Sequence, residues 1–329
     1  MELSIVIVNW NSAEFTIGCI ESIQAHTSRI AYEIIVVDNA SEGEFWRNIA
    51  VQFPSIKLIR SDNNLGFARA NNLGASHAAG KKLLFLNPDT LMFDNSIFMM
   101  ASILDVNPDI GLLGARLLNH DLSLQKTCVQ AFPTIVNQIV TIDWLKHRFP
   151  KLSIWGMRPL FSTSPSGVCD AEVVCGACLM LKREVFEKVG GFSTDYFMYA
   201  EEMDLCYKIR KAGWKVSHAT HALVVHFGGQ STKKRADGFS HVVMRESVYK
   251  LLRKFRGDNY AALYRAAVLV SAVLRIAVLF PLRLLPARIV DCEQITWSYR
   301  KWAKIASWSL SLETWTRQLG SSNTRTVRN

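Results

Sequence analysis

The segment LLFLNPDT, residues 83–90, carries an apolar run directly into Asn87, Pro88 and Asp89. Because Pro88 has no N–H to donate, a strand cannot continue pairing there, and Asn87 and Asp89 are left at the edge of its sheet. Carboxylate and amide oxygens suit Mg²⁺ or Mn²⁺ shared with a diphosphate. The segment therefore predicts a metal site. His226, which ends the apolar run of VVHFGG, either adds a ligand that favours Mn²⁺ or is structural.

A second acidic group lies in YAEEMDLC, where Glu201, Glu202 and Asp204 begin an amphipathic helical pattern that ends at Gly213. Acids in the first turn complement the dipole of a helix, which is one interpretation of the cluster. Beside the predicted metal site, one of the three carboxylates could instead deprotonate an acceptor hydroxyl as a general base. A metal on one wall of a crevice and a base on the other is the arrangement of a transferase.

A third carboxylate, Asp38, ends the β-branched run of EIIVVDNAS. Its oxygens can accept hydrogen bonds from ribose hydroxyls or from a pyrimidine N–H, although Asp38 could also be a helix N-cap. Farther along, NNLGFARANN places Gly66 in a turn with Arg69 on the following helix. A glycine there allows a backbone to approach a ligand closely.

These residues follow short apolar runs that alternate with helical patterns. The runs lie at residues 4–10, 32–41, 55–61 and 81–89. Such alternation predicts an α/β fold with a mostly parallel central sheet flanked by helices. Ligands of open sheets bind outside the carboxyl ends of the strands, so Asp38 and Asp89 should line one crevice.

The net charge of +10 lies in the C-terminal quarter of the chain. Residues 244–329 hold 15 Lys+Arg and 5 Asp+Glu, whereas the first 243 residues are neutral. A basic tail on a neutral body indicates contact with an anionic surface. Because the tail has no nucleic-acid-binding module and no aromatic-basic stacking pattern, we expect a membrane surface and no nucleic acid.

Residues 261–285 are strongly apolar but include Arg275, which would cost roughly 2.5–3.5 kcal/mol at the centre of a spanning helix. On one helical wheel Lys254, Arg265 and Arg275 fall together and leave a wide apolar face. This pattern predicts a helix that lies in the membrane interface. The alternative is a core-packing helix whose arginines extend to water. Four tryptophans suit either an interfacial belt or a core, namely Trp297, Trp302, Trp308 and Trp315.

The cysteines and the N-terminus predict a cytosolic protein. Seven cysteines lack the spacing of a disulfide framework, and the start Met1-Glu2 lacks the basic character of a signal peptide. Cys175 and Cys178 lie in an apolar run, where packing explains them better than redox or zinc chemistry. The turn NWNSAEF after the first run has no glycine, which argues against a dinucleotide-dependent oxidoreductase.

Seven segments, taken in order, resemble the family 2 inverting glycosyltransferases of the GT-A fold, especially the bacterial rhamnosyltransferase-like branch. They are IVIVNWN, VVDNAS, NLGFARANNLGA, LLFLNPDT, CGACLMLKREVFEKVGGF, FMYAEEMDLCYKIRKAGW and VVHFGGQST, within roughly residues 3–232. The resemblance implies a GT-A catalytic domain over 1–243, with a nucleotide-sugar half at about 1–125 and an acceptor half at about 126–243. Residues 244–329 would form a basic, amphipathic helical extension that associates with the membrane.

The resemblance also implies roles for individual residues. Contacts to the nucleotide sugar would come from Asn9, Asp38, Asn64, Gly66, Arg69 and Asn87. Asp89 matches the last position of the family's Asp-x-Asp metal motif, and His226 matches a metal ligand of some relatives. Glu202 matches the second acid of the family's Glu-Asp pair, the usual base, lengthened here by one methylene. Asp204 and Glu201 remain rival candidates for that role.

The implied reaction is inverting transfer of a sugar, L-rhamnose from dTDP-L-rhamnose, with Mg²⁺ or Mn²⁺. The acceptor would be a hydroxyl of a lipid-linked saccharide in O-antigen or cell-wall synthesis, at the cytoplasmic face of the inner membrane. Two alternatives stay open: the same fold using another UDP- or GDP-sugar, and a catalytically silent sugar-nucleotide-binding protein. Asn87 stands where the family's metal motif has its first Asp. Weaker metal binding there would favour the second alternative.

Overall fold

The computed structural model describes the chain except for residues 141–147, 150–151, 157–166, 229–238, 287–290 and 313–329. Its contacts form two compact units. Unit 1 comprises residues 1–132, 156–196 and 201–234, and unit 2 comprises residues 133–155, 197–200 and 235–329. The division of the catalytic domain near residue 125 stays a prediction.

Unit 1 is built on a nine-stranded sheet with the order β3-β2-β1-β4-β10-β6-β11-β5, and β8 pairs with β11. Its strands are β1 (Leu3–Asn9), β2 (Tyr32–Asn39), β3 (Lys57–Ser61), β4 (Lys82–Leu86), β5 (Thr90–Met92), β6 (Ile110–Leu118), β8 (Val168–Asp170), β10 (Cys178–Lys182) and β11 (Lys215–His226). The strands β3, β2, β1 and β4 are parallel, whereas β10 is antiparallel to β4 and to β6. A small second sheet pairs β7 (Val129–Gln130) with β9 (Val173–Val174).

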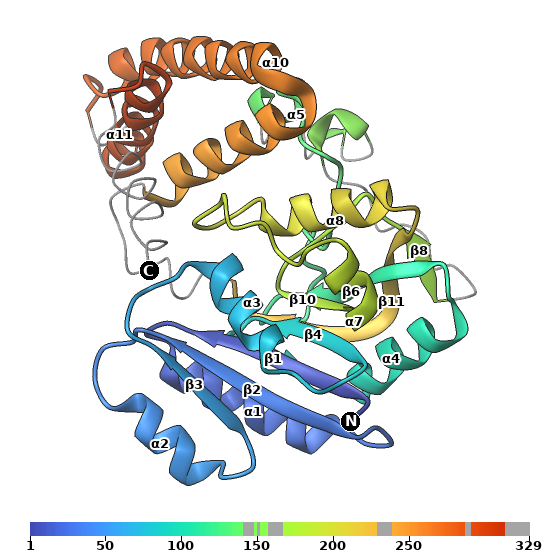
Figure 1. Cartoon of the computed structure of the whole chain (residues 1–329). Coiled ribbons are helices and arrows are strands. Elements are labelled where there is room, and N and C mark those ends of the chain that lie inside the picture. Colours follow the sequence, from blue (N-terminus) through green and yellow to red (C-terminus); the bar gives the residue numbers. More distant parts are fainter. Residues whose placement is uncertain (141–147, 150–151, 157–166, 229–238, 287–290, 313–329) are drawn as a thin grey trace, which may run out of the picture. The chain divides into compact units, whose positions relative to one another are not determined.

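Helices cover both faces of this sheet, as the alternating pattern predicts. They are α1 (Ala13–His26), α2 (Phe45–Gln52), α3 (Phe67–Ser76), α4 (Ser96–Val106), α7 (Arg183–Lys188) and α8 (Glu201–Lys211). Figure 1 shows α1 and α2 on one face of β1–β3 and α3 on the other, as right-handed crossovers in opposite directions require. A Cβ on Gly74 of α3 would lie 2.3 Å from Val6 Cγ1, so only glycine allows α3 to pack this closely.

The strand order explains why polar residues gather at one edge. β1 lies between β2 and β4, and its two neighbours are reached by crossovers on opposite faces. At such a switch point the two helices diverge and leave a crevice at the carboxyl ends of the strands. Asn9, Asp38 and Asp89 all stand at or just after those ends.

Unit 2 is helical in the part that the structure describes. It contains α5 (Ile135–Ile139), the 3-10 turn η1 (Ser153–Trp155), α10 (Phe239–Leu282) and α11 (Cys292–Ser309). Gly257 interrupts α10 with a φ of 84°, which divides it into segments 239–256 and 258–282. The expectation that Lys254, Arg265 and Arg275 share one helical wheel was therefore wrong, because no regular helix connects Lys254 to the two arginines.

A separate hydrophobic core holds these helices together. Its buried members are Val242, Val248, Leu252, Tyr264, Val268, Ala272, Ile305 and Trp308. Of the four tryptophans, Trp308 belongs to this core, Trp302 packs against it and Trp297 is 48% exposed. Trp315 lies outside the described residues. The tryptophans thus do not form one belt, since at least one of them is structural.

Within the described residues one helix is long and apolar enough to cross a membrane by length and composition. It is α10 over Ser240–Leu282, where the most apolar 18-residue window has a mean hydropathy of 2.0 and is 17% buried. A helix that lies in the membrane interface can have the same length and composition as one that crosses the membrane. The predicted interfacial position of this helix therefore stays a prediction.

Candidate active site

At the carboxyl ends of β1, β2 and β3, the parallel register aligns Asn9 with Asp38 and Asp38 with Arg60. Asp38 is fully buried, and its Oδ1 accepts a hydrogen bond from Asn9 Nδ2 at 3.0 Å. Its Oδ2 has no hydrogen-bond partner in the described part of the chain, and the Arg60 Nε lies 4.0 Å away. The alternative role as an N-cap does not apply, because Glu44 holds that position on α2.

Asn9 uses its whole amide group inside the protein. Its Nδ2 donates to Asp38 and to Ser41 Oγ at 2.9 Å, and its Oδ1 accepts from Ser12 Oγ at 2.9 Å and Thr16 Oγ1 at 3.0 Å. With both ends engaged, Asn9 can orient the Asp38 carboxylate more readily than it can contact a ligand. The sequence had no signal for the contact with Ser41, which lies 32 residues from Asn9.

The loop before α3 is fixed by Asn39 and Asn64. Asn39 Nδ2 donates to Asn64 Oδ1 at 3.0 Å, and Asn39 Oδ1 accepts from the Leu65 N–H at 2.8 Å. Asn64 Oδ1 also accepts from the Gly66 N–H at 2.9 Å, and Gly66 has a φ of 76° that favours glycine. One turn into α3, the buried Nε of Arg69 has no hydrogen-bond partner among the described residues.

The predicted metal ligands Asp89 and His226 lie together. β5 pairs with β11 so that Thr90 stands opposite His226, which brings Asp89 Oδ1 to 3.4 Å from His226 Nε2. Asn87 Nδ2 lies 3.4 Å from the same ring nitrogen. Asp89 is 7% exposed, so the pair forms a partly closed polar site. An Asn87 oxygen ligand would require its amide to turn over, since the nitrogen faces His226.

Gln125 fixes the tautomer of His226. Its Oε1 lies 2.8 Å from His226 Nδ1, while its Nε2 donates to His226 O at 3.4 Å and to Asn119 Oδ1 at 3.3 Å. An amide oxygen only accepts, so the ring proton belongs on Nδ1 and Nε2 presents its lone pair toward Asp89. Histidine ligands of metals are commonly oriented in this way by a hydrogen bond to the other ring nitrogen.

This donor set fits a divalent cation that a diphosphate helps to hold. Asp89 and His226 supply one oxygen and one nitrogen, and no third His, Cys, Asp or Glu joins them in the part of the chain that the structure describes. Mg²⁺ and Mn²⁺ at sugar-nucleotide or nucleotide sites complete their coordination with phosphate oxygens and waters. The imidazole favours Mn²⁺ over Mg²⁺.

Glu202 lies in the first turn of α8, above the turn Cys175–Ala177 that joins β9 to β10. A Cβ on Gly176 would lie 3.5 Å from Glu202 Cβ, and Ala177 O accepts a hydrogen bond from the Asn87 N–H at 2.9 Å. The same turn therefore contacts Glu202 and the end of β4. Burial raises the pKa of Glu202, partly offset by hydrogen bonds from its own N–H and from that of Met203.

Cys175 lies in the turn between β9 and β10, and both carboxylates affect its pKa. Burial raises the pKa of Cys175 to about 12, and the charges of Glu202 and Asp89 both contribute in the same direction. All seven cysteines are free thiols. Burial raises the pKa values of the buried ones, which leaves those buried thiols unreactive. The packing explanation for Cys175 and Cys178 agrees with this environment.

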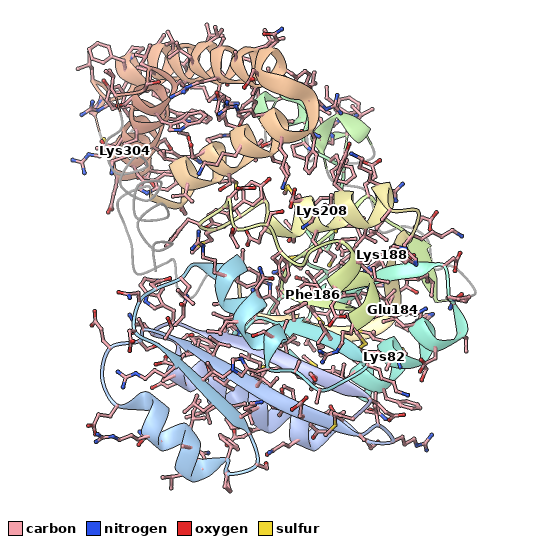
Figure 2. All side chains as sticks on the ribbon, in the orientation of Figure 1. Lys82, Glu184, Phe186, Lys188, Lys208 and Lys304 are labelled. Atoms are coloured by element: carbon pink, nitrogen blue, oxygen red, sulfur yellow. The ribbon has the colours of Figure 1, made fainter. Side chains whose placement is uncertain are left out.

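Of the two rival carboxylates, Asp204 has other partners. Asp204 is fully buried, accepts a hydrogen bond from Ser193 Oγ and lies 3.7 Å from Lys208 Nζ. Lys208, labelled in Figure 2 on α8, also donates to Gly191 O and to Ser193 Oγ at 3.2 Å. This network ties α8 to the segment after α7. Glu201 is 5% exposed and begins the helix.

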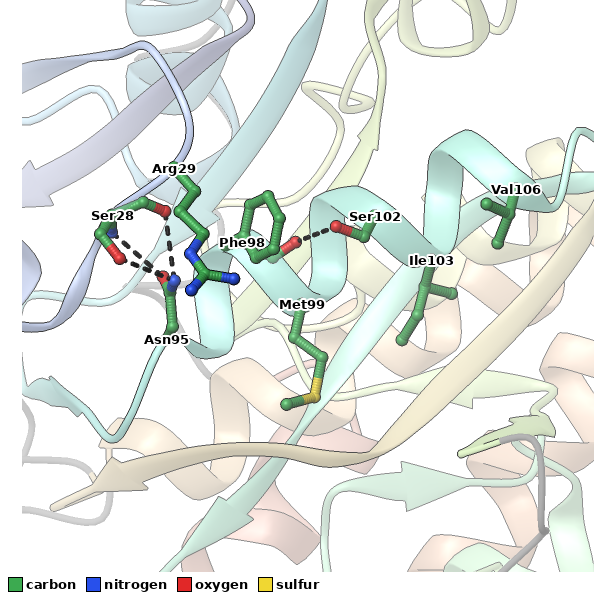
Figure 3. Close-up of a pocket in the computed structure, with 8 residues that line it drawn as sticks. All are labelled: Ser28, Arg29, Asn95, Phe98, Met99, Ser102, Ile103 and Val106. Atoms are coloured by element: carbon green, nitrogen blue, oxygen red, sulfur yellow. Dashed lines mark hydrogen bonds between the residues drawn. The ribbon is translucent and has the colours of Figure 1, made fainter.

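The pocket in Figure 3 lies apart from all of these residues. It is lined by Ser28 and Arg29, which precede β2, and by α4 with the adjacent Asn95. Asn95 Oδ1 accepts from the Ser28 N–H at 3.1 Å, and its Nδ2 donates to Ser28 Oγ at 2.9 Å. This pocket contains none of the predicted site residues, and α4 contributes mostly apolar side chains to it.

The chain is similar in sequence to proteins of one known family. The family model described as glycosyl transferase family 2 matches residues 4–190. The chain is 26% identical over 280 residues to N-acetylglucosaminyl-diphospho-decaprenol L-rhamnosyltransferase of Mycobacterium tuberculosis, covering 80% of this chain and 87% of that protein. It is 24% identical over 232 residues to rhamnosyltransferase WbbL of Escherichia coli K12, covering 68% and 82% respectively.

Other relatives extend the likeness beyond rhamnosyltransferases. Low-salt glycan biosynthesis hexosyltransferase Agl10 of Haloferax volcanii is 27% identical over 231 residues, covering 68% of this chain and 67% of that protein. Among solved structures, the mannosyltransferase PcManGT of Pyrobaculum calidifontis, in complex with GDP-Man and Mn²⁺, has a TM-score of 0.55 at 17% identity, covering 93% of this chain and 87% of that one. GalNAc-T7 with UDP, GalNAc and Mn²⁺ also gives 0.55 at 18% identity. There the match covers 69% of this chain and 44% of the other.

Proposed function

Because the chain belongs to glycosyl transferase family 2 and has the predicted GT-A fold, we propose that it is an inverting glycosyltransferase that moves L-rhamnose from dTDP-L-rhamnose to a lipid-linked saccharide. The enzyme class follows from the family. The donor and acceptor are proposed from the names of two relatives, an L-rhamnosyltransferase of a decaprenol-linked sugar and a rhamnosyltransferase.

The observation that carries the proposal is that one turn, Cys175–Ala177, contacts both Glu202 and Asn87, which stands two residues before Asp89. The Asp89–His226 pair can hold a cation beside a diphosphate, and the raised pKa of the Glu202 carboxyl suits a general base. The Cys175–Ala177 turn hydrogen-bonds to the segment of Asp89 and packs under Glu202. A leaving diphosphate and an attacking hydroxyl could thus meet at one anomeric carbon.

Donor binding uses the polar atoms that the fold leaves unpaired. Asp38 Oδ2 would accept a hydrogen bond from the base or ribose, with Asn9 holding the carboxylate in place. Arg69, behind the Asn64–Gly66 turn, would offer its guanidinium to the nucleotide or diphosphate. A divalent cation held by Asp89 and His226, with Asn87 beside them, would neutralise charge on the departing diphosphate.

In the reaction, the Glu202 carboxylate takes the proton of the acceptor hydroxyl while that oxygen attacks the anomeric carbon. The bond from the carbon to the diphosphate oxygen breaks, its electron pair leaves with the diphosphate, and configuration inverts. The transition state has oxocarbenium character, as in glycoside hydrolysis. Asp204 maintains the position of α8 through Ser193 and Lys208, so we assign the base role to Glu202.

The proposed lipid-linked acceptor would place the reaction at a membrane. A lipid-linked saccharide is held at the bilayer surface, and we propose that the enzyme works at the cytoplasmic face of the inner membrane in cell-surface polysaccharide synthesis. A basic C-terminal region supports this location, since each basic residue near an anionic leaflet contributes about 1 kcal/mol.

The test is donor turnover by the full chain. The protein is incubated with dTDP-, UDP- and GDP-sugars and with Mn²⁺, Mg²⁺ or EDTA, and nucleotide diphosphate release is measured with and without a membrane lipid extract. We expect release from dTDP-L-rhamnose that needs the metal and rises with the extract. Release from a different donor would replace rhamnose and keep the enzyme class. Nucleotide binding without release from any donor would favour the silent-binder alternative.

A further inference from the structure

Segment 258–282 of α10 directs its two arginines toward other helices of unit 2. Arg265 donates from Nε to Ser309 O at 3.1 Å and from Nη2 to Trp308 O at 2.7 Å, at the C-terminal end of α11. Ten residues later, Arg275 Nη2 donates to Ile139 O at 3.2 Å. Both arginines are partly exposed, and each of them satisfies a backbone carbonyl at a helix end.

The guanidinium groups are also packed on aromatic rings. Arg265 lies 5.1 Å from the ring centroid of Trp308, and Arg275 lies 4.2 Å from that of Trp302. Such cation–π contacts hold a charge in place where water is partly excluded. The two arginines are therefore held against unit 2 by hydrogen bonds and by ring contacts.

The opposite face of the same segment is apolar and exposed. Its large side chains are 52–63% exposed and recur at helical spacing: Leu263, Val270, Val273, Leu274 and Val278. We call these five residues the apolar face. The residues that pack into the core lie on the other side of the helix and include Tyr264, Val268 and Ala272. A contiguous exposed apolar surface of this kind marks a site of contact with another apolar phase.

Charge identifies that phase as an anionic bilayer in preference to a second copy of the chain. Residues 244–329 carry 15 basic and 5 acidic side chains, so two copies joined through this region would bring like charges together. Directly after the segment, Arg283 lies 4.5 Å from the ring centroid of Tyr299, and on α11 Lys301 lies 5.3 Å from that of Trp297. Aromatic and basic side chains of this kind favour the headgroup zone of a membrane.

The inward hydrogen bonds also determine how the segment meets the bilayer. Arg265 and Arg275 are about 15 Å apart along the helix axis, and each is bonded to a different neighbouring helix of unit 2. If segment 258–282 crossed the membrane, it would have to carry those partners into the hydrocarbon or break the bonds. A helix held along its length can instead enter sideways, to a depth of about 5–10 Å.

We propose that the apolar face of segment 258–282 inserts into the cytoplasmic leaflet of an anionic bilayer, with the helix parallel to the membrane plane. This deepens the proposed function by naming the surface that meets the lipid. It rests on that function only in the choice of membrane, because vesicle binding requires neither donor nor acceptor.

The test compares two charge-matched double variants of the full chain by co-sedimentation with phosphatidylcholine vesicles containing phosphatidylglycerol. Leu274→Glu with Val278→Glu alters the apolar face. Val51→Glu with Val106→Glu adds the same charge at unit 1 positions that are 83% and 76% exposed. We expect the first variant to bind at least tenfold more weakly than wild type, since each lost side chain contributes apolar burial, and the second to bind within about twofold.

Three results would overturn the proposal. If the Leu274→Glu, Val278→Glu variant bound vesicles as tightly as wild type, the apolar face would be excluded as the contact. A Leu274→Ser, Val278→Ser variant serves the same purpose if the glutamates prevent folding. Failure of wild type to bind vesicles would remove the bilayer as partner. A wild-type dimer that the face variant converts to a monomer, without vesicle binding, would assign the face to a second copy. Vesicle binding by a protein that turns over no donor would leave this inference intact and contradict the proposed function.

Discussion

The proposed donor site of unit 1 and the apolar face of unit 2 leave opposite kinds of groups unsatisfied. In unit 1 the unpaired groups are polar and buried, such as Asp38 Oδ2 and Arg69 Nε within the described residues. In unit 2 the charges of Arg265 and Arg275 are paired inward, while Leu274 and its apolar neighbours face outward. Since unpaired buried polar atoms and exposed apolar patches both cost free energy, each unit indicates the chemistry of its partner. This contrast agrees with the proposals of a charged donor for unit 1 and of a lipid surface for unit 2.

The largest effect should follow from removing the charge of the proposed metal site. Asp89→Asn is expected to reduce donor turnover by about 10³-fold, since a bound cation contributes several kcal/mol of transition-state stabilisation. Turnover is measured as nucleotide diphosphate release over a Mn²⁺ titration. Asp94→Asn, an exposed residue in the turn after β5, is the control and should match wild type. Turnover of Asp89→Asn within tenfold of wild type would contradict the assignment.

Glu202→Gln should reduce turnover by about 10²- to 10⁴-fold, the usual contribution of a general base. Unlike a structural substitution, it should not weaken the fold. The control is Glu184→Gln on α7, an exposed carboxylate labelled in Figure 2, which should leave turnover and unfolding temperature unchanged. Asp204→Asn offers a contrast, because it disturbs the contacts with Ser193 and Lys208 and should lower the unfolding temperature.

The raised pKa of Glu202 gives this prediction a pH dependence of known sign. A carboxyl whose pKa is higher in the folded state binds its proton more tightly there, so its contribution to stability is present below the unfolded pKa and is lost as pH rises through the folded value. Glu202→Gln should thus unfold at a higher temperature than wild type at neutral pH, with the difference disappearing at low pH. Wild-type kcat/KM should fall as pH drops through the raised pKa.

The sequence predicted the positions of the site better than its supporting contacts. Pro88 ends its strand by its own chemistry, so the residue types alone were enough to put Asp89 at the sheet edge. Asn9 was expected to contact the donor, and nothing local shows that Asp38 and Ser41 accept hydrogen bonds from its amide nitrogen. Those contacts depend on how separate segments of the chain approach one another.

The same limit applies to the helical region. Periodicity indicated that Arg265 and Arg275 share a side of the helix, and the structure agrees that they do. Periodicity cannot say whether that side meets water or protein, because the answer depends on where α11 and α5 end. Gly257 was a visible helix-breaking signal that the single wheel did not take into account.

Gln125 illustrates a contact that no local pattern could reveal, as it lies 101 residues from His226 in sequence. Gln125→Ala should weaken Mn²⁺ binding about 10- to 100-fold, the usual cost of losing the group that orients a histidine ligand. Gln125→Glu keeps an acceptor for Nδ1–H and should bind Mn²⁺ like wild type, as should the control Gln130→Ala. The ring ¹⁵N shifts of His226 should report the Nδ1–H tautomer in wild type and a mixture in Gln125→Ala. Equal shifts in the two proteins would exclude this positioning role.

The smallest effect in this series should separate the two units. Arg275→Met keeps the length and apolar stem of the side chain and removes the hydrogen bond to Ile139 O together with the contact on Trp302. Since hydrogen bonds from charged groups contribute about 1.5–3 kcal/mol, the free energy of unfolding of unit 2 should fall by about that amount in chemical denaturation.

Nucleotide diphosphate release from a soluble donor should not change in this variant, because every residue assigned to that reaction lies in unit 1. Arg283→Met is the matched control, as Arg283 stacks on Tyr299 at an exposed position and should have a smaller effect on unfolding. If Arg275→Met were as stable as wild type, the arginine would not be anchored inside unit 2, and the argument for a helix held parallel to the membrane would lose its support. If stability fell and vesicle binding persisted, the apolar face would be shown to act independently of the interior that positions it.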